Sequence, residues 1–445
     1  MQKNILSFKK ILKIKLPFFF FLSLIILFNM SQISLNDTKK DLNIKNCKTI
    51  SYIKNQKLNP ENFKTFDLKL DIPDQRKWKK ILFENQISRE KNGHYLNANN
   101  IDAVFIIKTN SNIECKLKAI IRPHGDLIDH HVSFTEGNRF IYDLPSLNVR
   151  LKDGHIFGIT KFLLLRPETR NNGNEILTTT ILEEMSILAP RSAFVNVSYN
   201  NELTKLIFQE KIVKEFLENN ALIEGPIYEG DERFMFKYPD LVTTGLIKHR
   251  MTNGKWTELN NNNFNVASRG LEILNFANHF YSDFRTNAVI DYYSSLNSTF
   301  LSDSFKLFPV YDALAFGIGY AHNLGIGNRR FYYDPVTNDF YPIYYDGFTP
   351  GQNILIDSKN KIIKRYNLID IEKYIYFSWG PENHKDFIIP YSARQGSKEA
   401  ILLLDNLNFD KLHNKLEERG LYLSKDVLKI VIKNIRLNLL SLQKI

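Results

Sequence analysis

The chain has 445 residues, of which 43% are hydrophobic and 13% aromatic, enough to bury the core of one large two-lobed domain or of more than one domain. Its net charge of +11 suits an anionic ligand or a membrane surface. Five of the positive charges belong to the N-terminal segment, and no basic stripe with interleaved aromatic residues follows, which argues against nucleic-acid binding. The sequence lacks the G-x-S-x-G, H-E-x-x-H, C-x-x-C and Walker A motifs, which argues against a serine hydrolase, a zinc protease and a P-loop enzyme.

Residues 1–30 have the pattern of a signal peptide or a signal anchor. Lysines precede the apolar run Leu16–Phe28, as a positive n-region precedes an h-region. The run is shorter than the roughly 20 apolar residues that a spanning helix needs. Because the positive charges lie before the run, we expect the rest of the chain to be exported. It would lie in the periplasm or cell envelope, either released by cleavage or anchored to the inner membrane by residues 16–28.

A polar stretch separates this segment from the main domain. Residues 31–99 are predicted to be a polar linker and an N-terminal extension, with a strand at Phe66–Ile72 and a short helix at Trp78–Phe83. Cys47 and Cys115 are the only cysteines. They are compatible with one disulfide in an oxidising compartment, but two cysteines leave the pairing open.

The main domain reads as strands followed mostly by helices. Alternating or β-branched segments predict strands at 103–109, 115–122, 146–152, 160–165, 193–199 and 205–211. Helical spacing of apolar residues begins at Asn174, and the polar run Thr257–Asn265 is expected to be a loop. Further helices are predicted at 270–281, 287–296, 301–316 (broken at Pro309), 368–378, 397–404, 409–418 and 424–442.

A β-hairpin is predicted within His322–Gly347. Its arms, Arg330–Tyr333 and Phe340–Tyr345, are rich in aromatic residues and flank the turn sequence DPVTND. Asn328 precedes the first arm and Asp346 follows the second. The hairpin would bring these two oxygen-bearing side chains together, and such ligands suit Mg²⁺. The alternative is a surface hairpin with a solvated Asn and Asp.

The order Asn, hairpin, Asp before Gly resembles that of protein kinases. More closely, NRRFYYDPVTNDFYPIYYDG (328–347) resembles the core motif of the spore-coat CotH kinase family. The resemblance implies an α+β, two-lobed atypical protein-kinase-like fold in residues 100–445. Its β-rich N-lobe would span about 100–215, and its mostly helical C-lobe, about 216–445, would carry the active-site hairpin.

The resemblance also implies roles for individual residues. Asn328 and Asp346 would hold Mg²⁺, and ATP would be the nucleotide. An Arg-Gly loop after a strand matches Arg122 and Gly125, and a Glu at a strand-to-helix passage, followed by Lys211, matches Glu210. The implied nucleotide-binding residues are Arg122, Gly125, Arg150 with Lys161 as its rival, and Glu210.

The sequence departs from the family at the catalytic aspartate. Residues Gly317–Gly327, which precede Asn328, contain no Asp, so His322 and Asp312 are the candidates for the group that takes the substrate proton. We expect an ATP- and Mg-dependent kinase that phosphorylates Ser or Thr hydroxyls of an envelope or surface protein, most simply a Ser-containing one. The alternative is an inactive pseudokinase or a binding module for envelope or surface-polymer assembly.

Overall fold

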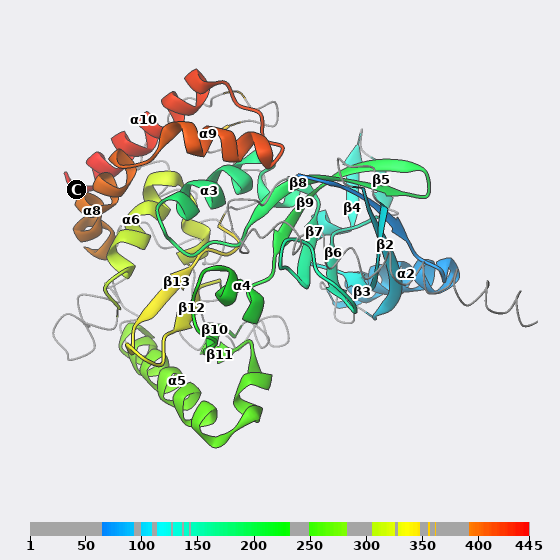
Figure 1. Ribbon diagram of the computed structural model, residues 1–445, viewed down its shortest axis with the longest axis horizontal. Helices are drawn as coiled ribbons and strands as arrows, with labels where there is room; N and C mark the ends of the chain where they lie inside the picture. Colours follow the sequence, from blue (N-terminus) through cyan, green and yellow to red (C-terminus); the bar gives the residue numbers. More distant parts are fainter. Residues whose placement is uncertain are drawn as a thin grey trace, which may run out of the picture.

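The structure is a computed structural model with mixed α+β architecture (Figure 1). It describes residues 65–92, 99–108, 114–125, 128–135, 138–141, 144–231, 249–282, 305–324, 328–347, 355–356, 361 and 391–444. The predicted signal segment, the linker and Cys47 lie outside these residues. Within the described part, no helix is both long and apolar enough to cross a bilayer.

Seven strands close into a barrel in the order β1-β2-β3-β6-β7-β9-β8. β1 pairs antiparallel with β2 and parallel with β8, so the barrel cannot close without it. The β-rich part of the chain therefore begins before residue 100, earlier than predicted from the sequence. The strands are β1 (Asp67–Asp71), β2 (Ile101–Lys108), β3 (Glu114–Pro123), β6 (Leu147–Leu151), β7 (Lys161–Leu165), β8 (Ser192–Tyr199) and β9 (Glu202–Glu210).

The barrel interior is apolar and is capped by a helix. The rings of Phe162 and Phe208 stack inside it with centroids 4.4 Å apart. Helix α2 (Gln75–Asn92) is longer than the predicted Trp78–Phe83, and it buries Trp78 in the same core. Because successive side chains of a strand alternate between faces, the residues between the buried ones face outward.

The predicted hairpin is confirmed. Strands β12 (Arg330–Tyr333) and β13 (Phe340–Ile343) pair antiparallel, with Arg330 opposite Ile343 and Tyr333 opposite Phe340. The turn closes through a hydrogen bond from the Asp334 N–H to the Asp339 carbonyl, 2.9 Å. β10 (Ile227–Gly230) and β11 (His249–Met251) extend it to a sheet of order β11-β10-β12-β13, and β4 (Val132–Thr135) and β5 (Asn138–Ile141) form a separate hairpin.

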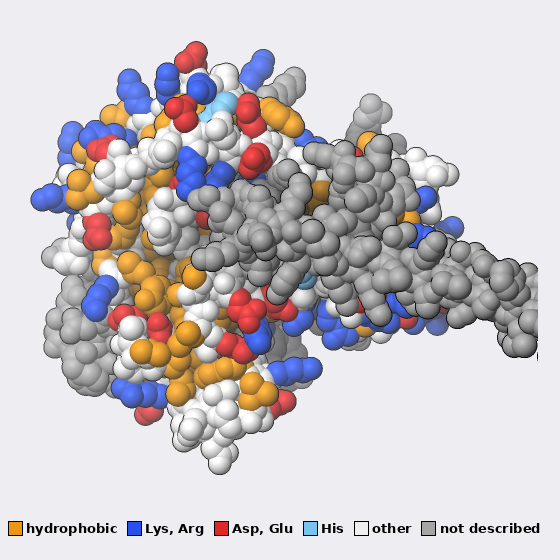
Figure 2. Space-filling model, in the orientation of Figure 1, with side chains coloured by type: hydrophobic (Ala, Val, Ile, Leu, Met, Phe, Trp, Pro, Cys, Tyr) orange, Lys and Arg blue, Asp and Glu red, His pale blue; other side chains and the backbone are white. Residues whose placement is uncertain are grey.

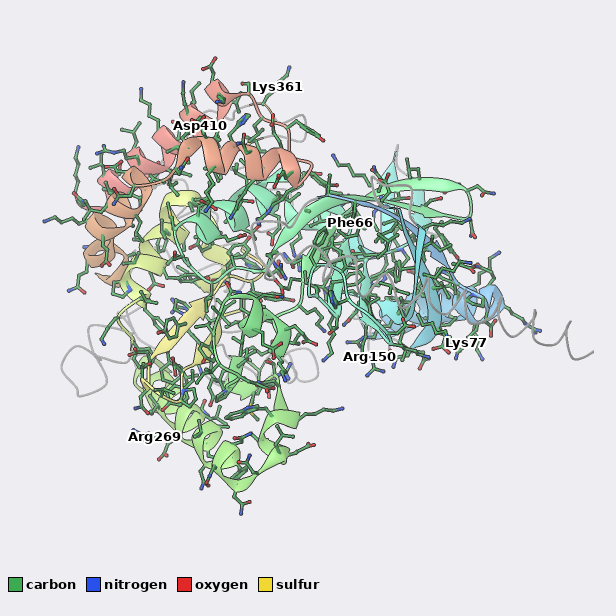
Figure 3. All side chains as sticks on the ribbon, viewed as in Figure 1. Phe66, Lys77, Arg150, Arg269, Lys361 and Asp410 are labelled. Carbon is green, nitrogen blue, oxygen red and sulfur yellow. The ribbon has the colours of Figure 1, made fainter. Side chains whose placement is uncertain are left out.

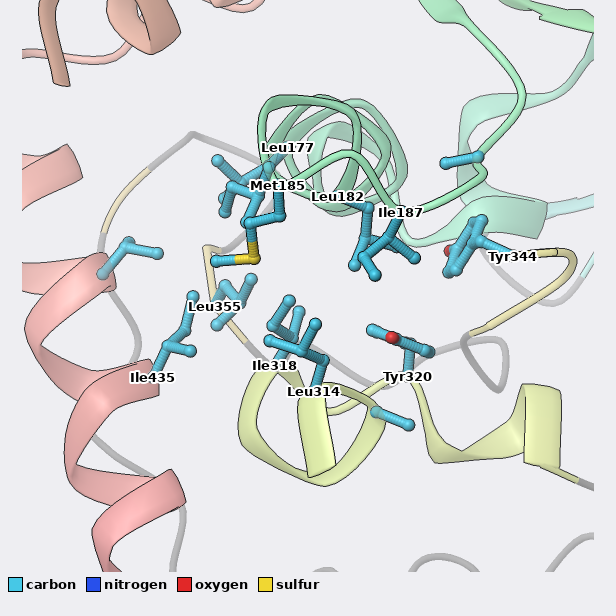
Figure 4. Packing of buried hydrophobic residues seen from close by; sticks show 14 of the residues in the cluster. Leu177, Leu182, Met185, Ile187, Leu314, Ile318, Tyr320, Tyr344, Leu355 and Ile435 are labelled. Carbon is cyan, nitrogen blue, oxygen red and sulfur yellow. The ribbon is translucent and has the colours of Figure 1, made fainter. Parts of the chain in front are cut away.

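The helical part packs around α6, whose residues are almost all buried. Figure 4 shows Leu177 and Leu182 of α3 facing Leu314 and Ile318 of α6, with Ile435 of α10 beside them. α3, which precedes the last barrel strands in sequence, thus belongs to this core. The helices are α3 (Gly173–Glu184), α4 (Lys214–Asn219), α5 (Asn261–Ser282), α6 (Phe308–Ile318), α8 (Tyr391–Asp405), α9 (Phe409–Glu418) and α10 (Lys425–Leu442).

Two helix starts differ from the prediction, for local reasons. α5 begins inside the run that was predicted to be a loop, because the Asn260 side chain accepts a hydrogen bond from the Asn263 N–H, 2.9 Å, as a capping residue does. Pro309 does not break a helix. It stands in the first turn of α6, where the missing N–H costs nothing.

The last two predicted helices are confirmed, and each has a side-chain cap. Asn408 accepts from the Lys411 N–H (3.0 Å) and Ser424 from the Val427 N–H (3.2 Å). On the face shown in Figure 2, lysine, arginine and acidic side chains intermix over the outer side of these helices. Their apolar sides face the core. The predicted helices at 287–296 and 368–378 lie outside the described residues.

Candidate functional site

The two ends of the hairpin lie side by side. Continuing the pairing of Arg330 with Ile343 by two residues brings Asn328 level with Tyr345, next to Asp346. The sequence prediction that these two side chains share one end of the hairpin therefore agrees with the register.

Asp346 is held by an unusual backbone conformation and by an arginine. Its φ is +48°, and its Oδ1 accepts from Nη1 of Arg170 at 3.0 Å. A Cβ on the next residue, Gly347, would lie 2.5 Å from the Tyr344 ring and 2.6 Å from Cβ of Tyr320, so only glycine fits there. Among the described residues, Arg170 fixes this carboxylate through one oxygen, and a carboxylate has a second oxygen with which to bind a further ligand.

Asn328 is held by His322, a residue of the 3₁₀ helix η8 (Ala321–Leu324). Nδ2 of Asn328 lies 2.9 Å from Nε2 of His322. The amide nitrogen can only donate, so Nε2 accepts and the ring is neutral, with its proton on Nδ1. Burial lowers the pKa of His322, which favours the same neutral form. His322 therefore orients the Asn328 amide, and its Nε2 lone pair is not open to a substrate proton.

Asp312 does not fit the catalytic role predicted for it. It lies on α6 with 0% of its surface exposed. Its carboxylate accepts from Nη2 of Arg329 at 3.3 Å. A fully buried, paired carboxylate cannot meet the hydroxyl of a protein substrate, so the prediction for Asp312 is wrong.

Arg170 is the residue that sequence reasoning missed, since the sequence marks it only as a polar residue before a helix. It ends the 3₁₀ helix η3 (Pro167–Arg170), and the following Asn171 and Asn172 both have positive φ. This tight turn buries Arg170, which is 4% exposed. Burial is the largest single influence and lowers the pKa of Arg170, but Asp346 and, after it, Tyr345, Glu175 and Tyr344 together outweigh burial and raise this pKa.

Glu175, in the first turn of α3, joins three parts of the molecule. Its carboxylate accepts from the Tyr344 hydroxyl (2.6 Å) and from Nε2 of Gln209 on β9 (2.5 Å). Burial raises the pKa of Glu175 to about 7. Glu183, further along α3, pairs with Arg419 of the C-terminal part.

A group of cations stands where β9 ends, and we call it the Lys211 cluster. Burial lowers the pKa of Lys211 to about 8, and the charges of Arg122, Arg330 and Lys161 lower it further. The Lys211 N–H also donates to the Lys161 carbonyl, 3.1 Å. Arg122 and Lys161 were predicted to bind nucleotide, and both belong to this cluster. Several cations that repel one another form a site suited to a polyanion.

Arg150 and Glu210 are placed differently from the predictions made for them. Arg150 is exposed on the outer edge of the barrel (Figure 3). Glu210 is buried, and its carboxylate accepts from Nε of Arg191 (2.9 Å) and Nδ2 of Asn219 (2.7 Å). These hydrogen bonds link the end of β9 to Arg191, just before β8, and to α4, and they occupy both carboxylate oxygens of Glu210.

The loop after β3, which contains Gly125, packs on the Arg170 side of the site. Gly125 has φ +87°, and a Cβ there would overlap the His130 ring. The rings of His124 and His130 lie 5.6 Å apart. Burial lowers the pKa of both histidines well below the usual range, and Arg170 adds to the effect. The charges of Lys211 and Arg122 also lower the pKa of His124, so this ring is within electrostatic reach of both Arg170 and the Lys211 cluster.

The donor set at the hairpin ends fits Mg²⁺ better than a metal with a full protein cage. Among the described residues, no group of three or more His, Cys, Asp or Glu side chains is placed to hold a metal ion. Mg²⁺ commonly takes one or two protein oxygens and completes its shell with water and phosphate. Asp346 and the Oδ1 of Asn328 supply such a pair.

Among solved structures, the chain is similar to the crystal structure of the Helicobacter pylori proinflammatory kinase CtkA, with 10% sequence identity and a TM-score of 0.28. The match covers 76% of this chain and 89% of that chain. No family model matches the sequence, and no curated protein matches it. At this identity and TM-score the likeness assigns neither fold nor activity, so the functional conclusion rests on the side chains described above.

Proposed function

We propose that this chain is a CotH-like protein kinase that binds Mg·ATP between the barrel and the hairpin. It would transfer the γ-phosphoryl group to a Ser or Thr hydroxyl of an envelope or surface protein. One observation carries the proposal. The fixed carboxylate of Asp346 pairs with Arg170, and the charges of both Arg170 and Lys211 act on the same buried ring, that of His124, so the acid and the cations belong to one neighbourhood. A triphosphate with its metal needs this juxtaposition of an acid and several cations.

Each residue of the site has a distinct task in this proposal. Lys211, Arg122 and Lys161 bind phosphate oxygens through charge-assisted hydrogen bonds. Asp346 and Asn328 hold Mg²⁺, which when bound offsets negative charge on the phosphates. The chain itself supplies the preorganisation, since Arg170 and Gly347 fix Asp346 and His322 fixes Asn328.

The N-terminal pattern supports an exported protein, and therefore an acceptor in the periplasm or cell envelope. Residues 1–30 have the features of a signal peptide or anchor. A Ser-containing envelope protein is the simplest acceptor under this proposal. Fractionation of cells that produce the full chain tests the location, and recovery in the soluble cytoplasmic fraction would refute it.

Nucleotide binding is tested by titrating ATP into the full chain with Mg²⁺ and with EDTA. We expect binding that strengthens with Mg²⁺, and at least roughly tenfold weaker Mg-dependent binding in Asp346→Asn, because Mg²⁺ loses a charged ligand. Asp410→Asn is the matched control, since Asp410 lies on α9 (Figure 3), where it forms an exposed pair with Lys425. A parent chain that does not bind ATP, or an Asp346→Asn variant that binds Mg·ATP equally well, would refute the proposal.

A binding module without catalysis is the second candidate. The observation in its favour is that both predicted proton acceptors are committed, Asp312 to Arg329 and His322 to Asn328. An exported kinase also meets little ATP outside the cytoplasm. Incubation with γ-labelled ATP separates the two candidates, since Mg·ATP binding without labelled protein favours the binding module.

A further inference from the structure

The cations of the Lys211 cluster continue onto the outer face of the barrel. Strands β7 and β9 pair up to Phe162 and Glu210. The next residues are Lys161 and Lys211, and the N–H of Lys211 donates to the Lys161 carbonyl at 3.1 Å. On the other side of β7, Lys161 stands directly opposite Arg150 of β6. The register of the barrel therefore places three cations in one row across three neighbouring strands.

Further cations widen this row to a patch. On β3, Lys116 and Lys118 are exposed at alternate positions, as residues on one face of a strand are. Lys118 lies level with Lys152, the residue after β6, whose N–H donates to the Lys118 carbonyl at 2.7 Å. Arg122, near the other end of β3, is exposed on the same face. We call this patch the basic face, and its members are Lys116, Lys118, Arg122, Arg150, Lys152 and Lys161.

The basic face is only weakly neutralised by the protein itself. Like charges directly opposite one another on neighbouring strands destabilise a sheet. This arrangement occurs twice here, in Arg150 with Lys161 and in Lys118 with Lys152. Lys152 pairs with Asp102 at 2.6 Å, whereas the other three form no ion pair within the described part of the chain. A surface that holds such repulsion suits an anionic partner.

The acids beside the basic face do not change this conclusion. Asp153 accepts a hydrogen bond from the backbone N–H of Lys118. Glu215, in the first turn of α4, accepts from the Thr160 hydroxyl. Both carboxylates therefore bind neutral donors, and the lysine and arginine head groups remain available to an acid from outside.

We infer that the basic face is the docking surface for an acidic segment of the protein acceptor, and the inference rests on the proposed kinase function. Its charge complements such a segment. Strands about 4.8 Å apart place Arg150 about 10 Å from Lys211 along the row, so an acceptor bound here can extend to the phosphates held by the Lys211 cluster.

The spacing of the cations also fits a polypeptide. Alternate residues of an extended chain repeat about every 6.7 Å, which is the spacing of Lys116 and Lys118 along β3. Asp or Glu at every second position of an extended acceptor would therefore meet successive lysines. The exposed positions of this face carry no aromatic side chain in the described strands β3, β6 and β7, which disfavours a single-stranded nucleic acid.

The test measures the binding of two fluorescein-labelled octapeptides to the full chain by anisotropy, at low ionic strength, where charges are screened least. One peptide alternates Asp and Ser, and the other has Asn in place of Asp. Mg·ATP affinity is measured by titration, and transfer of label from γ-labelled ATP to the Asp peptide gives kcat and KM. Vesicles of phosphatidylglycerol and phosphatidylcholine provide the lipid comparison.

Two variants lose the same charge from different places. The basic-face variant loses three exposed cations outside the Lys211 cluster: Lys116→Gln, Lys118→Gln and Arg150→Gln. The matched control loses three exposed lysines of the C-terminal part: Lys398→Gln, Lys433→Gln and Lys444→Gln. We expect the basic-face variant alone to bind the Asp peptide about tenfold more weakly, with KM raised and kcat unchanged. Mg·ATP affinity should stay within about twofold in both variants, because the Lys211 cluster is intact.

The outcomes separate this inference from the proposed function. A parent chain that does not prefer the Asp peptide to the Asn peptide, or an equal loss in both variants, would overturn the inference. A basic-face variant that keeps peptide binding but loses binding to the phosphatidylglycerol vesicles would also overturn it, in favour of a lipid surface. A parent chain that binds the Asp peptide through the basic face but neither binds Mg·ATP nor transfers label would refute the kinase and leave the docking surface standing.

Discussion

Glu175 gives the structure a pH-dependent stability that can be worked out in advance. In the unfolded chain this carboxyl group loses its proton near its ordinary pKa of 4.5, whereas in the folded chain burial raises the pKa to about 7. Between these two pH values the folded state binds more protons than the unfolded state. Stability must therefore fall as the pH rises through this window, and it levels off above pH 7.

The size of the effect follows from the shift itself. A rise from 4.5 to about 7, at about 1.4 kcal/mol for each pKa unit, amounts to roughly 3 kcal/mol. Glu175→Gln removes the titration. The glutamine oxygen can accept from Nε2 of Gln209, and its amide can donate to the Tyr344 hydroxyl, so both neighbours keep a partner. We expect the variant to gain stability on the parent as pH rises from 5 to 8.

The assay is urea unfolding of parent and variant at pH 5, 6 and 8, followed by circular dichroism. The difference between the two free energies of unfolding should change by up to roughly 3 kcal/mol across this range, in favour of the variant at pH 8. Parallel pH profiles would refute the reasoning, since they would mean that Glu175 is ionised in the folded chain at pH 5.

Three further predictions concern the surroundings of the site. Gly347→Ala should destabilise the hairpin end by about 1–3 kcal/mol in urea unfolding, whereas Gly254→Ala, where an added Cβ meets nothing within 4 Å, should not; equal effects would contradict the steric account. Arg419→Met removes the fully buried partner of Glu183 and should lower the free energy of unfolding by roughly 3 kcal/mol. Arg436→Met, at an exposed ion pair, should change it little. A larger loss for Arg436→Met would show that burial does not set the contribution of an ion pair to stability. ATP affinity measured at pH 7 and pH 9 should fall roughly tenfold through deprotonation of Lys211, whose pKa is about 8, and Lys211→Met should be weaker at pH 7 and lack this fall; a flat profile in the parent would exclude Lys211 from phosphate binding.

Local signals in the sequence were sufficient for the hairpin and the terminal helices. The DPVTND turn and the aromatic arms determine β12 and β13 within a short stretch, and caps at Asn408 and Ser424 mark helix starts. Apolar and polar residues alternate along the barrel strands, and this alternation is visible within a few residues of sequence. Most barrel strands could therefore be predicted. The start of α5 was not predicted, because its capping residue, Asn260, lies within a run of polar residues that resembles a loop.

The contacts that build the site could not be predicted in this way, because they join distant segments. The Tyr344 hydroxyl donates to Glu175 across 169 residues of sequence, and Arg170 meets Asp346 over a similar separation. No periodicity or turn signal encodes such a pair. The same limit applies to Asp312 and Glu210. Carboxylates are suited to the roles predicted for them, but the sequence does not show that Asp312 pairs with Arg329 and Glu210 with Arg191.

The account depends on Asn328 and Asp346 sharing one divalent cation. Crystals of the chain grown with Mn²⁺ and a non-hydrolysable ATP analogue would test this directly, because Mn²⁺ scatters anomalously and shares the hard oxygen ligands of Mg²⁺. We predict an anomalous peak about 2.1 Å from a carboxylate oxygen of Asp346 and from Oδ1 of Asn328. A peak bound elsewhere, or nucleotide density with no peak at the hairpin ends, would contradict it.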